Sequence, residues 1–151
     1  MTASILITST KTDKKKDKHQ EHIDYLFDIA KTIPPLAGAR VAASIVYKND
    51  IVTIGMNSSK THTFQFRFSS NPDAIFFHAE NNAIYKALRI LTPKELEKSV
   101  LYVCRAKYTD KNKKTFMQGL AKPCCGCTEA IIKYNISSVI YSLDNYGYEW
   151  L

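Results

Sequence analysis

Apolar and polar residues follow a helical period in three stretches of the chain. Between Ile23 and Ile33 the apolar residues recur every three or four positions, and Pro34-Pro35 stops the run. A second helical pattern runs from His78 to Leu91 and stops at Thr92-Pro93, and a third runs from Cys124 to Tyr134. The pattern therefore predicts three helices.

Short β-branched and apolar segments between these helices predict strands. Arg40 to Tyr47 and Ile51 to Asn57 are separated by Lys48-Asn49-Asp50, which is a hairpin signal, and further strands are predicted at Val100 to Lys107 and Ser137 to Leu143. The order helix, strand, strand, helix, strand, helix, strand is typical of an α/β fold in which helices pack on a mixed sheet.

Three segments do not follow a clear period. Residues 1–18 are basic and poor in apolar side chains after Ile7, so we expect a disordered head followed by one domain over residues 19–151. Ser58 to Ala74 is polar and predicts a long loop, with room for a short strand. After Leu143 the last residues either fold back as an antiparallel strand through an Asn-x-Gly turn, which we favour, or leave the sheet one strand short.

Composition and charge narrow the class of protein. The chain has 151 residues, 45% hydrophobic and 23% charged, which suits one globular domain with a core of its own. It shows no stretch of about 18 uninterrupted apolar residues and no charged start typical of a secretory signal, so we expect a cytoplasmic protein, in the host cytoplasm if the source is viral. The net charge of +7 rests partly on two lysine clusters, which are either solvated surface or a means of steering a phosphate-bearing partner.

Two short motifs carry candidate chemistry. His78-Ala79-Glu80 offers an imidazole and a carboxylate, and Pro123-Cys124-Cys125-Gly126-Cys127 offers two thiols at a Cys-x-x-Cys spacing. Three nitrogen and sulfur ligands beside an unligated carboxylate describe a catalytic zinc site, because structural zinc sites close all four positions. The clustering of the cysteines also favours a reducing compartment.

With these motifs the chain resembles the cytidine and deoxycytidylate deaminase superfamily, and within it the deoxycytidylate deaminases. The resemblance rests on His78 to Ile84 and Lys122 to Cys127 and extends over about Arg40 to Ser142. It implies a three-layer α-β-α sandwich with a mixed sheet of four to five strands and helices on both faces. It also implies Zn²⁺ as the cofactor and assembly into a homo-oligomer.

The predicted roles at the centre follow the chemistry of deamination. His78, Cys124 and Cys127 are expected to hold zinc, which lowers the pKa of water to roughly 7 and so supplies hydroxide. Glu80 is expected to carry protons to N3 and to the departing amine of the base. The alternative is a zinc knuckle that binds partners without catalysis, with a fourth ligand from Cys125, His62 or Cys104.

Substrate contacts are expected beside this centre. The family resemblance implies that Asn57 meets the sugar or base edge and that the backbone N–H of Ala79 meets the base carbonyl. Three basic residues of the following loop are candidates for a phosphate contact, namely Lys60, His62 and Arg67. Phe66 is the candidate to stack on the base, although Phe64, Phe66 and Phe68 can equally be core residues.

These residues and the family resemblance together predict a zinc-dependent hydrolase that converts a cytosine nucleotide, with deoxycytidylate as the expected substrate, to the uracil nucleotide and ammonia. The nearest alternative substrates are cytidine and deoxycytidine. A base in single-stranded DNA or RNA is a more distant alternative, to which the basic head and several C-terminal aromatic residues would contribute. No membrane association is expected.

Overall fold

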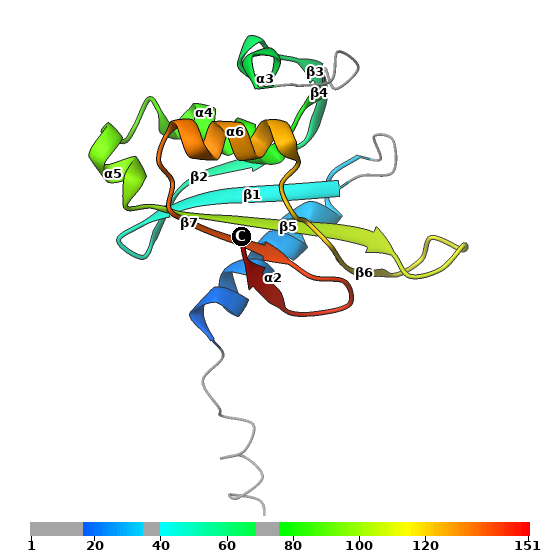
Figure 1. Cartoon of the computed structure of the whole chain (residues 1–151). Helices are drawn as coiled ribbons and strands as arrows, with labels where there is room; N and C mark the ends of the chain where they lie inside the picture. The colour runs from blue at the N-terminus through cyan, green and yellow to red at the C-terminus, as the bar shows by residue number, and fades with distance from the viewer. Residues whose placement is uncertain (1–16, 35–39, 69–75) are drawn as a thin grey trace, which may run out of the picture.

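The computed structural model describes residues 17–34, 40–68 and 76–151, and its centre is a mixed six-stranded sheet (Figure 1). Five strands form a continuous path in the order β2 (Asp50–Met56), β1 (Arg40–Tyr47), β5 (Val100–Tyr108), β7 (Ser138–Ser142) and β8 (Tyr148–Trp150). The sixth, β6 (Phe116–Gly119), pairs with the end of β5. Of these pairs only β5 with β7 is parallel.

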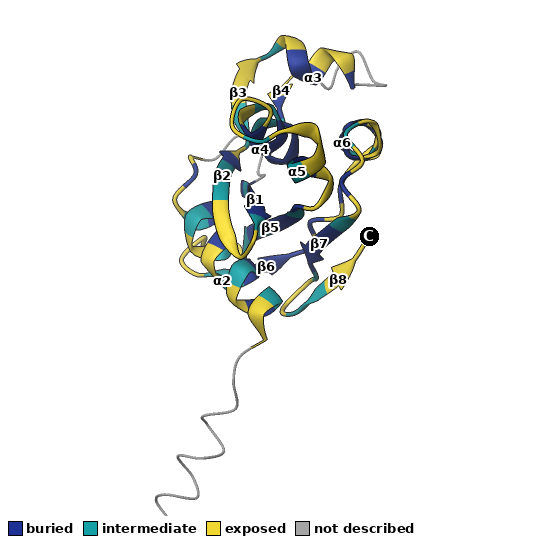
Figure 2. Ribbon diagram, turned by 90° about the vertical axis from the view of Figure 1, so that its left-hand side faces the viewer, coloured by how far each residue is buried: buried dark blue, intermediate teal, exposed yellow. Residues whose placement is uncertain are grey.

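Helices cover both faces of this sheet (Figures 1 and 2). One face carries α2 (Lys18–Lys31), and the other carries α4 (Ala79–Ala87) and α6 (Cys125–Lys133). Two short helices, α3 (Thr63–Arg67) and α5 (Pro93–Glu97), add to the second layer, where β3 (Ser58–Thr61) and β4 (Phe76–Phe77) form a separate two-stranded sheet. The predicted three-layer α-β-α sandwich is confirmed, and β6 takes the main sheet beyond the four to five strands expected.

The central strand β5 shows how the sequence builds two cores. Leu101 and Val103 pack with α4 and α6, whereas Tyr102, Cys104 and Ala106 pack with α2. Successive side chains of a strand point to opposite faces, so a strand covered by helices on both faces is apolar throughout. Arg105 lies on the α4 and α6 side by the same alternation.

Tight turns set the register of both hairpins. Lys48 and Asn49 have φ of 50° and 68° between β1 and β2, as a two-residue type I′ turn requires. At the C-terminus β8 pairs antiparallel with β7, and the turn uses positive φ at Asn145 and Gly147. The favoured prediction for the C-terminal residues is therefore confirmed.

Several predicted boundaries were wrong. The first helix begins at Lys18, about a turn before Ile23, because the Asp17 side chain accepts a hydrogen bond from the backbone N–H of His19 and caps it. The helix predicted to run to Leu91 ends at Ala87, and Thr92 with Glu95 then forms a capping box that starts α5. The strand β6 was not expected at all.

The loop predicted over residues 58–74 was given room for a short strand, which β3 confirms, but the helix α3 was not expected, and residues 69–74 lie outside the described residues. Its first part forms β3 and α3, although Phe64, Phe66 and Phe68 alternate with polar residues as in a strand. Phe64 in α3 and Phe68 at its C-cap lie four positions apart and both are buried, so the same residues satisfy a helical period.

Two expectations concern the ends and surface of the chain. The basic head falls mainly on residues 1–16, outside the described residues, and the single domain over residues 19–151 stays a prediction. Within the described ranges, no helix combines the length and the apolar character needed to cross a lipid bilayer.

Candidate metal centre and adjoining cavity

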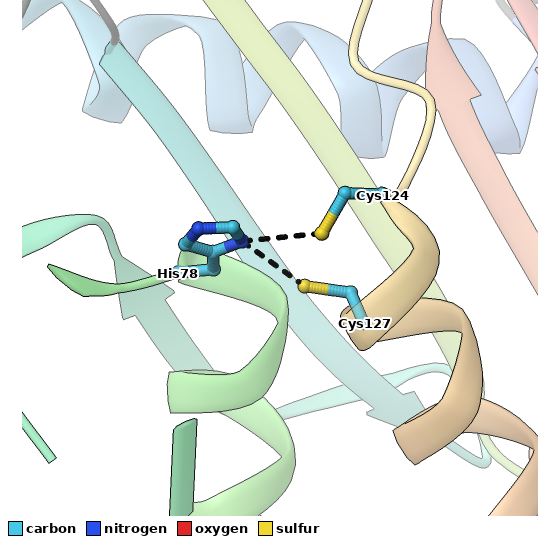
Figure 3. A group of neighbouring side chains, drawn as sticks. All are labelled: His78, Cys124 and Cys127. Atoms are coloured by element: carbon cyan, nitrogen blue, oxygen red, sulfur yellow. Dashed lines mark hydrogen bonds between the residues drawn. The ribbon is translucent and has the colours of Figure 1, made fainter. Parts of the chain in front are cut away.

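The N-termini of α4 and α6 bring three metal-binding side chains together (Figure 3). His78 is the N-cap of α4 and Cys124 the N-cap of α6, with Cys127 in the first turn of α6. The His78 Nδ1 lies 3.4 Å from the Cys124 Sγ and 3.3 Å from the Cys127 Sγ. Because both thiols and the ring approach from helix ends, the sheet fixes the group by fixing the two helices.

The donor set and its spacing fit zinc. Tetrahedral zinc with bonds near 2.0 Å to nitrogen and 2.3 Å to sulfur places these atoms about 3.5 Å apart, close to the two distances here. One nitrogen and two sulfur atoms, all within 4.8 Å of one another, leave a fourth tetrahedral position for another ligand. Within the part of the chain that the structure describes, this is the one group of histidine, cysteine and acidic side chains with metal-binding spacing.

The two thiols differ in their surroundings. A hydrogen bond from Cys127, aided by His78, lowers the pKa of the Cys124 thiol to about 3 when no metal is bound. The same hydrogen bond, with burial, raises the pKa of Cys127. The pair thus readily carries one negative charge, and a dication is needed to hold two thiolates side by side.

Glu80 lies in the first turn of α4 and is buried, with 7% of its surface exposed. Burial raises the pKa of its carboxyl above the usual carboxylate value, partly offset by the hydrogen bond to its own backbone and the nearby His78. A carboxyl group that titrates closer to neutrality can both accept and donate a proton under physiological conditions.

The helix α4 sits unusually close to β2 because of Gly55. A Cβ atom at Gly55 would lie 2.4 Å from the carbonyl oxygen of Ala79 and 2.5 Å from the backbone nitrogen of Ala83. Three side chains tie the two elements together: Thr53 donates to Ala83 O, Asn82 donates to Met56 O and Lys86 donates to Ile54 O. These contacts set how far the N-terminus of α4 reaches toward α6.

Gln65 in α3 supports the same helix end. Its side-chain oxygen accepts hydrogen bonds from the backbone N–H of His78 and from the side-chain amide of Asn81, both at 3.0 Å. Gln65 and Asn81 are almost fully buried, at 1% and 0% exposure. Sequence reasoning missed both residues, because a glutamine in a polar loop carries no signal of burial.

His78, Cys124 and Cys127 are called the metal group below. A cavity of about 580 Å³ opens beside this metal group and is large enough for a nucleotide. Among the described residues it is lined by the catalytic motifs, by the end of β2 with the start of β3, and by the strand ends near α6: Val41, Asn57, Ser58, Ser59, Phe76, Phe77, His78, Ala79, Glu80, Arg105, Leu120, Ala121, Lys122 and Cys124. Its walls therefore bring together segments far apart in the sequence.

The predicted substrate residues are distributed unevenly around this cavity. Asn57 and Ala79 line it, and the Asn57 side chain accepts a hydrogen bond from the backbone N–H of Val41. Lys60, His62, Phe66 and Arg67 are not among its described lining residues. The His62 ring instead caps α3 through Phe64 N and stacks on Phe77, and Phe66 is exposed on α3.

The cavity also contains residues that the sequence did not single out. Phe76 and Leu120 are exposed at 50% and 45%, and both line the cavity, so apolar surface is available there for a planar ring. Arg105 and Lys122 add two positive charges. The sequence predicted only a strand at Val100 to Lys107 and assigned no role to Arg105 within it.

The other cysteines are placed apart from the metal group. Cys104 is fully buried in the core between β5 and α2. Cys125 is exposed, and neither residue belongs to the group with metal-binding spacing.

Comparison with known proteins gives one family and several related folds. The family model for the cytidine and deoxycytidylate deaminase zinc-binding region matches residues 16–143. Comparison with curated proteins yields no match.

Three solved structures of two proteins illustrate the likeness in fold. The dCMP deaminase of cyanophage S-TIM5 in its apo form is 20% identical, with 85% of this chain and 86% of the phage chain covered and a TM-score of 0.55. The cytidine deaminase of Burkholderia pseudomallei is 18% identical, with 85% and 90% covered and a TM-score of 0.53. A second structure of the phage enzyme, in complex with dCMP and dUMP, has a TM-score of 0.50 at 18% identity and covers 83% and 78%.

Proposed function

The chain belongs to the cytidine and deoxycytidylate deaminase family, and we propose that it deaminates deoxycytidylate to deoxyuridylate and ammonia. Because it belongs to this family, the chain is a zinc-dependent hydrolytic deaminase. The choice of deoxycytidylate as its substrate is our proposal. The observation that carries it is the cavity in which the metal group, a buried carboxyl and two cationic side chains face the same space.

The chain's own residues account for the roles that deamination requires. His78, Cys124 and Cys127 would hold the zinc ion, which would supply hydroxide at neutral pH by lowering the pKa of water. Glu80 accepts the proton released from that water and delivers it to N3 of the base, which makes C4 electrophilic. Glu80 then moves the remaining proton, from the hydroxyl oxygen added at C4, to the exocyclic nitrogen, so that the C4–N bond breaks, ammonia leaves and C4 keeps the oxygen as a carbonyl.

The base must lie with C4 toward the metal group for these transfers to occur. The backbone N–H of Ala79 at the N-terminus of α4 is proposed to donate to the base carbonyl, and Asn57 to contact the sugar. The apolar side chains of Phe76 and Leu120 flank the same cavity. The relative that was solved with dCMP and dUMP has a related fold, which supports a cytosine nucleotide as the substrate class.

A nucleoside is the second candidate substrate, because related folds include a cytidine deaminase. The two cationic lining residues favour a phosphorylated substrate. Assembly into a homo-oligomer remains a prediction, as do phosphate contacts from Lys60, His62 and Arg67.

The test is ammonia release from cytidine, deoxycytidine, deoxycytidylate, deoxycytidine triphosphate and a cytosine-containing oligonucleotide. Zinc content is matched between the wild type, Glu80→Gln and the control Glu129→Gln, whose side chain is exposed on α6. We expect deoxycytidylate to turn over fastest and Glu80→Gln to lose at least about a hundredfold in kcat, as for loss of a general acid and base. Equal turnover by Glu80→Gln, or a preference for a nucleoside, would contradict the proposal.

A further inference from the structure

We propose that Arg105 binds the 5′-phosphate of the substrate and makes the enzyme selective for nucleotides over nucleosides. The inference rests on the proposed function, which it deepens by assigning the phosphate to one side chain. Four features of Arg105 support it: its place in the cavity, its lack of a partner, the space made for it, and the charge around it.

The first feature is position. Arg105 comes near the end of β5, on the face that packs against α4 and α6, and it lines the same cavity as His78, Glu80 and Cys124. Leu101 and Val103 precede it on that face as buried core residues. A charged residue thus follows an apolar row at the point where the row reaches the cavity.

The second feature is that the guanidinium has no partner among the described residues. Its Nε is buried without a hydrogen-bond partner, and its side chain makes no ion pair there. The nearby carboxylate of Asp144 already accepts from Lys107 Nζ at 2.8 Å and from Leu120 N at 3.1 Å. Arg105 as a whole is half-buried, but a buried N–H donor without a partner is costly, which favours an anionic ligand that completes it.

The third feature is the space that Gly119 provides. A Cβ atom at Gly119, the β6 partner of Arg105, would lie 3.2 Å from both Cγ and Cδ of Arg105. The glycine lets the arginine stem lie across the β5–β6 ladder. A side chain at position 119 would crowd this stem, so the glycine leaves the arginine room beside the cavity.

The fourth feature is the charge of the cavity. Lys122 adds a second positive charge, and the hydroxyl-bearing Ser58 and Ser59 line the same space. The N-termini of α4 and α6 contribute partial positive charge. A guanidinium presents paired N–H donors that match a phosphate, whereas a nucleoside would leave them without an acceptor.

The experiment compares deoxycytidylate with deoxycytidine for the wild type, Arg105→Ala, Arg105→Lys and the control Arg89→Ala. Arg89 is exposed after α4 and contacts Tyr85, away from the cavity. For Arg105→Ala we expect kcat/KM for deoxycytidylate to fall about 10- to 100-fold, mostly through KM, with little change for deoxycytidine. Arg105→Lys should recover part of the loss, and Arg89→Ala should match the wild type.

Binding of the product provides a readout independent of turnover. Calorimetry of zinc-loaded wild type should give tighter binding of deoxyuridylate than of deoxyuridine, and Arg105→Ala should abolish the difference. If the wild type is inert on every substrate but still prefers deoxyuridylate through Arg105, the proposed function fails and this inference stands.

Two outcomes would overturn the inference. In one, Arg105→Ala affects nucleotide and nucleoside equally, which would assign Arg105 a purely structural role. In the other, the arginine-dependent preference appears only with a cytosine-containing oligonucleotide, which would mean that the phosphate belongs to a nucleic-acid backbone and not to a free nucleotide.

Discussion

The side-chain oxygen of Gln65 accepts a hydrogen bond from the backbone N–H of His78 at 3.0 Å. This hydrogen bond links the short helix α3 to His78, which caps α4 and offers the imidazole of the metal group. The same oxygen accepts from Asn81 Nδ2, so one buried amide orients two positions of the helix end.

Replacing Gln65 with methionine should therefore weaken zinc binding. Methionine keeps the volume but leaves the N–H of His78 and the amide of Asn81 without this acceptor, at a cost of about 1–3 kcal/mol for each buried group. We expect zinc affinity, measured by competition with a chelator, to fall about 10- to 100-fold, as for other residues that orient metal ligands. Gln65 is a positioning residue, so proton transfer by Glu80 should persist at saturating zinc.

Gln20→Met provides the matched control. Gln20 is also buried and donates to Asp24, but it lies in α2 on the opposite face of the sheet. It should lose some stability and keep the wild-type zinc affinity. Equal zinc affinity in Gln65→Met and Gln20→Met would contradict the role assigned to Gln65.

Gly55→Ala should displace the helix that carries His78 and Glu80. The added Cβ would meet backbone atoms of Ala79 and Ala83, which cannot rotate away as a side chain can. Overpacking of this kind costs about 1–3 kcal/mol, and we expect such a loss in the free energy of unfolding together with a clear loss of kcat.

The comparison variant for Gly55 is Gly147→Ala. Gly147 has φ of +97° in the C-terminal turn, and a Cβ there would meet only Leu143 Cδ1 at 4.0 Å. Its substitution should lower stability through backbone strain and leave kcat unchanged. If both variants retained full activity, the close approach of α4 to β2 would not control the site.

The metal group could be predicted from the sequence because each part of it is local. His78 and Cys124 precede helical patterns, and the Cys-x-x-Cys spacing places Cys124 and Cys127 at the start of one helix turn whatever the rest of the fold does. Only the meeting of the two helix ends needed the tertiary structure, and the family resemblance supplied it.

Other features depend on contacts that no local pattern encodes. Phe64 and Phe68 alternate as in a strand, but the His62 cap and their packing near Tyr134 place them in a helix. The role of Gln65 depends on burial under α4. The environment of Arg105 depends on the strand β6. This strand was not predicted from the lysine-rich stretch that precedes it.

Acid should destabilise the folded protein partly through His22. Burial, and then the charge of His19, lowers the pKa of His22, whose ring stacks on Tyr102 at 4.4 Å between centroids. A lowered histidine pKa means that the unfolded chain binds the proton more readily. The stability that neutral His22 contributes is therefore present above its ordinary pKa of 6.5 and is lost as the pH falls below it.

The measurement is urea unfolding of zinc-free wild type and His22→Phe between pH 5 and pH 8. Titration of His78 is common to both proteins and cancels in their difference. Relative to the wild type, His22→Phe should gain stability as the pH falls. A difference that does not change with pH would contradict the shift.

Thiol labelling should separate the cysteines by environment and test the zinc-knuckle alternative. In zinc-loaded protein at pH 8 we expect iodoacetamide to modify the exposed Cys125, while zinc protects Cys124 and Cys127. Cys104 should stay unmodified, since burial raises its pKa to about 12 and keeps it protonated. Mass spectrometry of peptides identifies each site.

Removal of zinc by a chelator should add Cys124 to the labelled set, because its thiol ionises readily without the metal. Cys104 should react only on unfolding. Since its folded pKa is raised, its contribution to stability is complete below the ordinary value of 9.0 and is lost as the pH rises toward about 12. Zinc-dependent protection of Cys125 would instead make it a fourth ligand, close the open position and argue against hydrolysis at this centre.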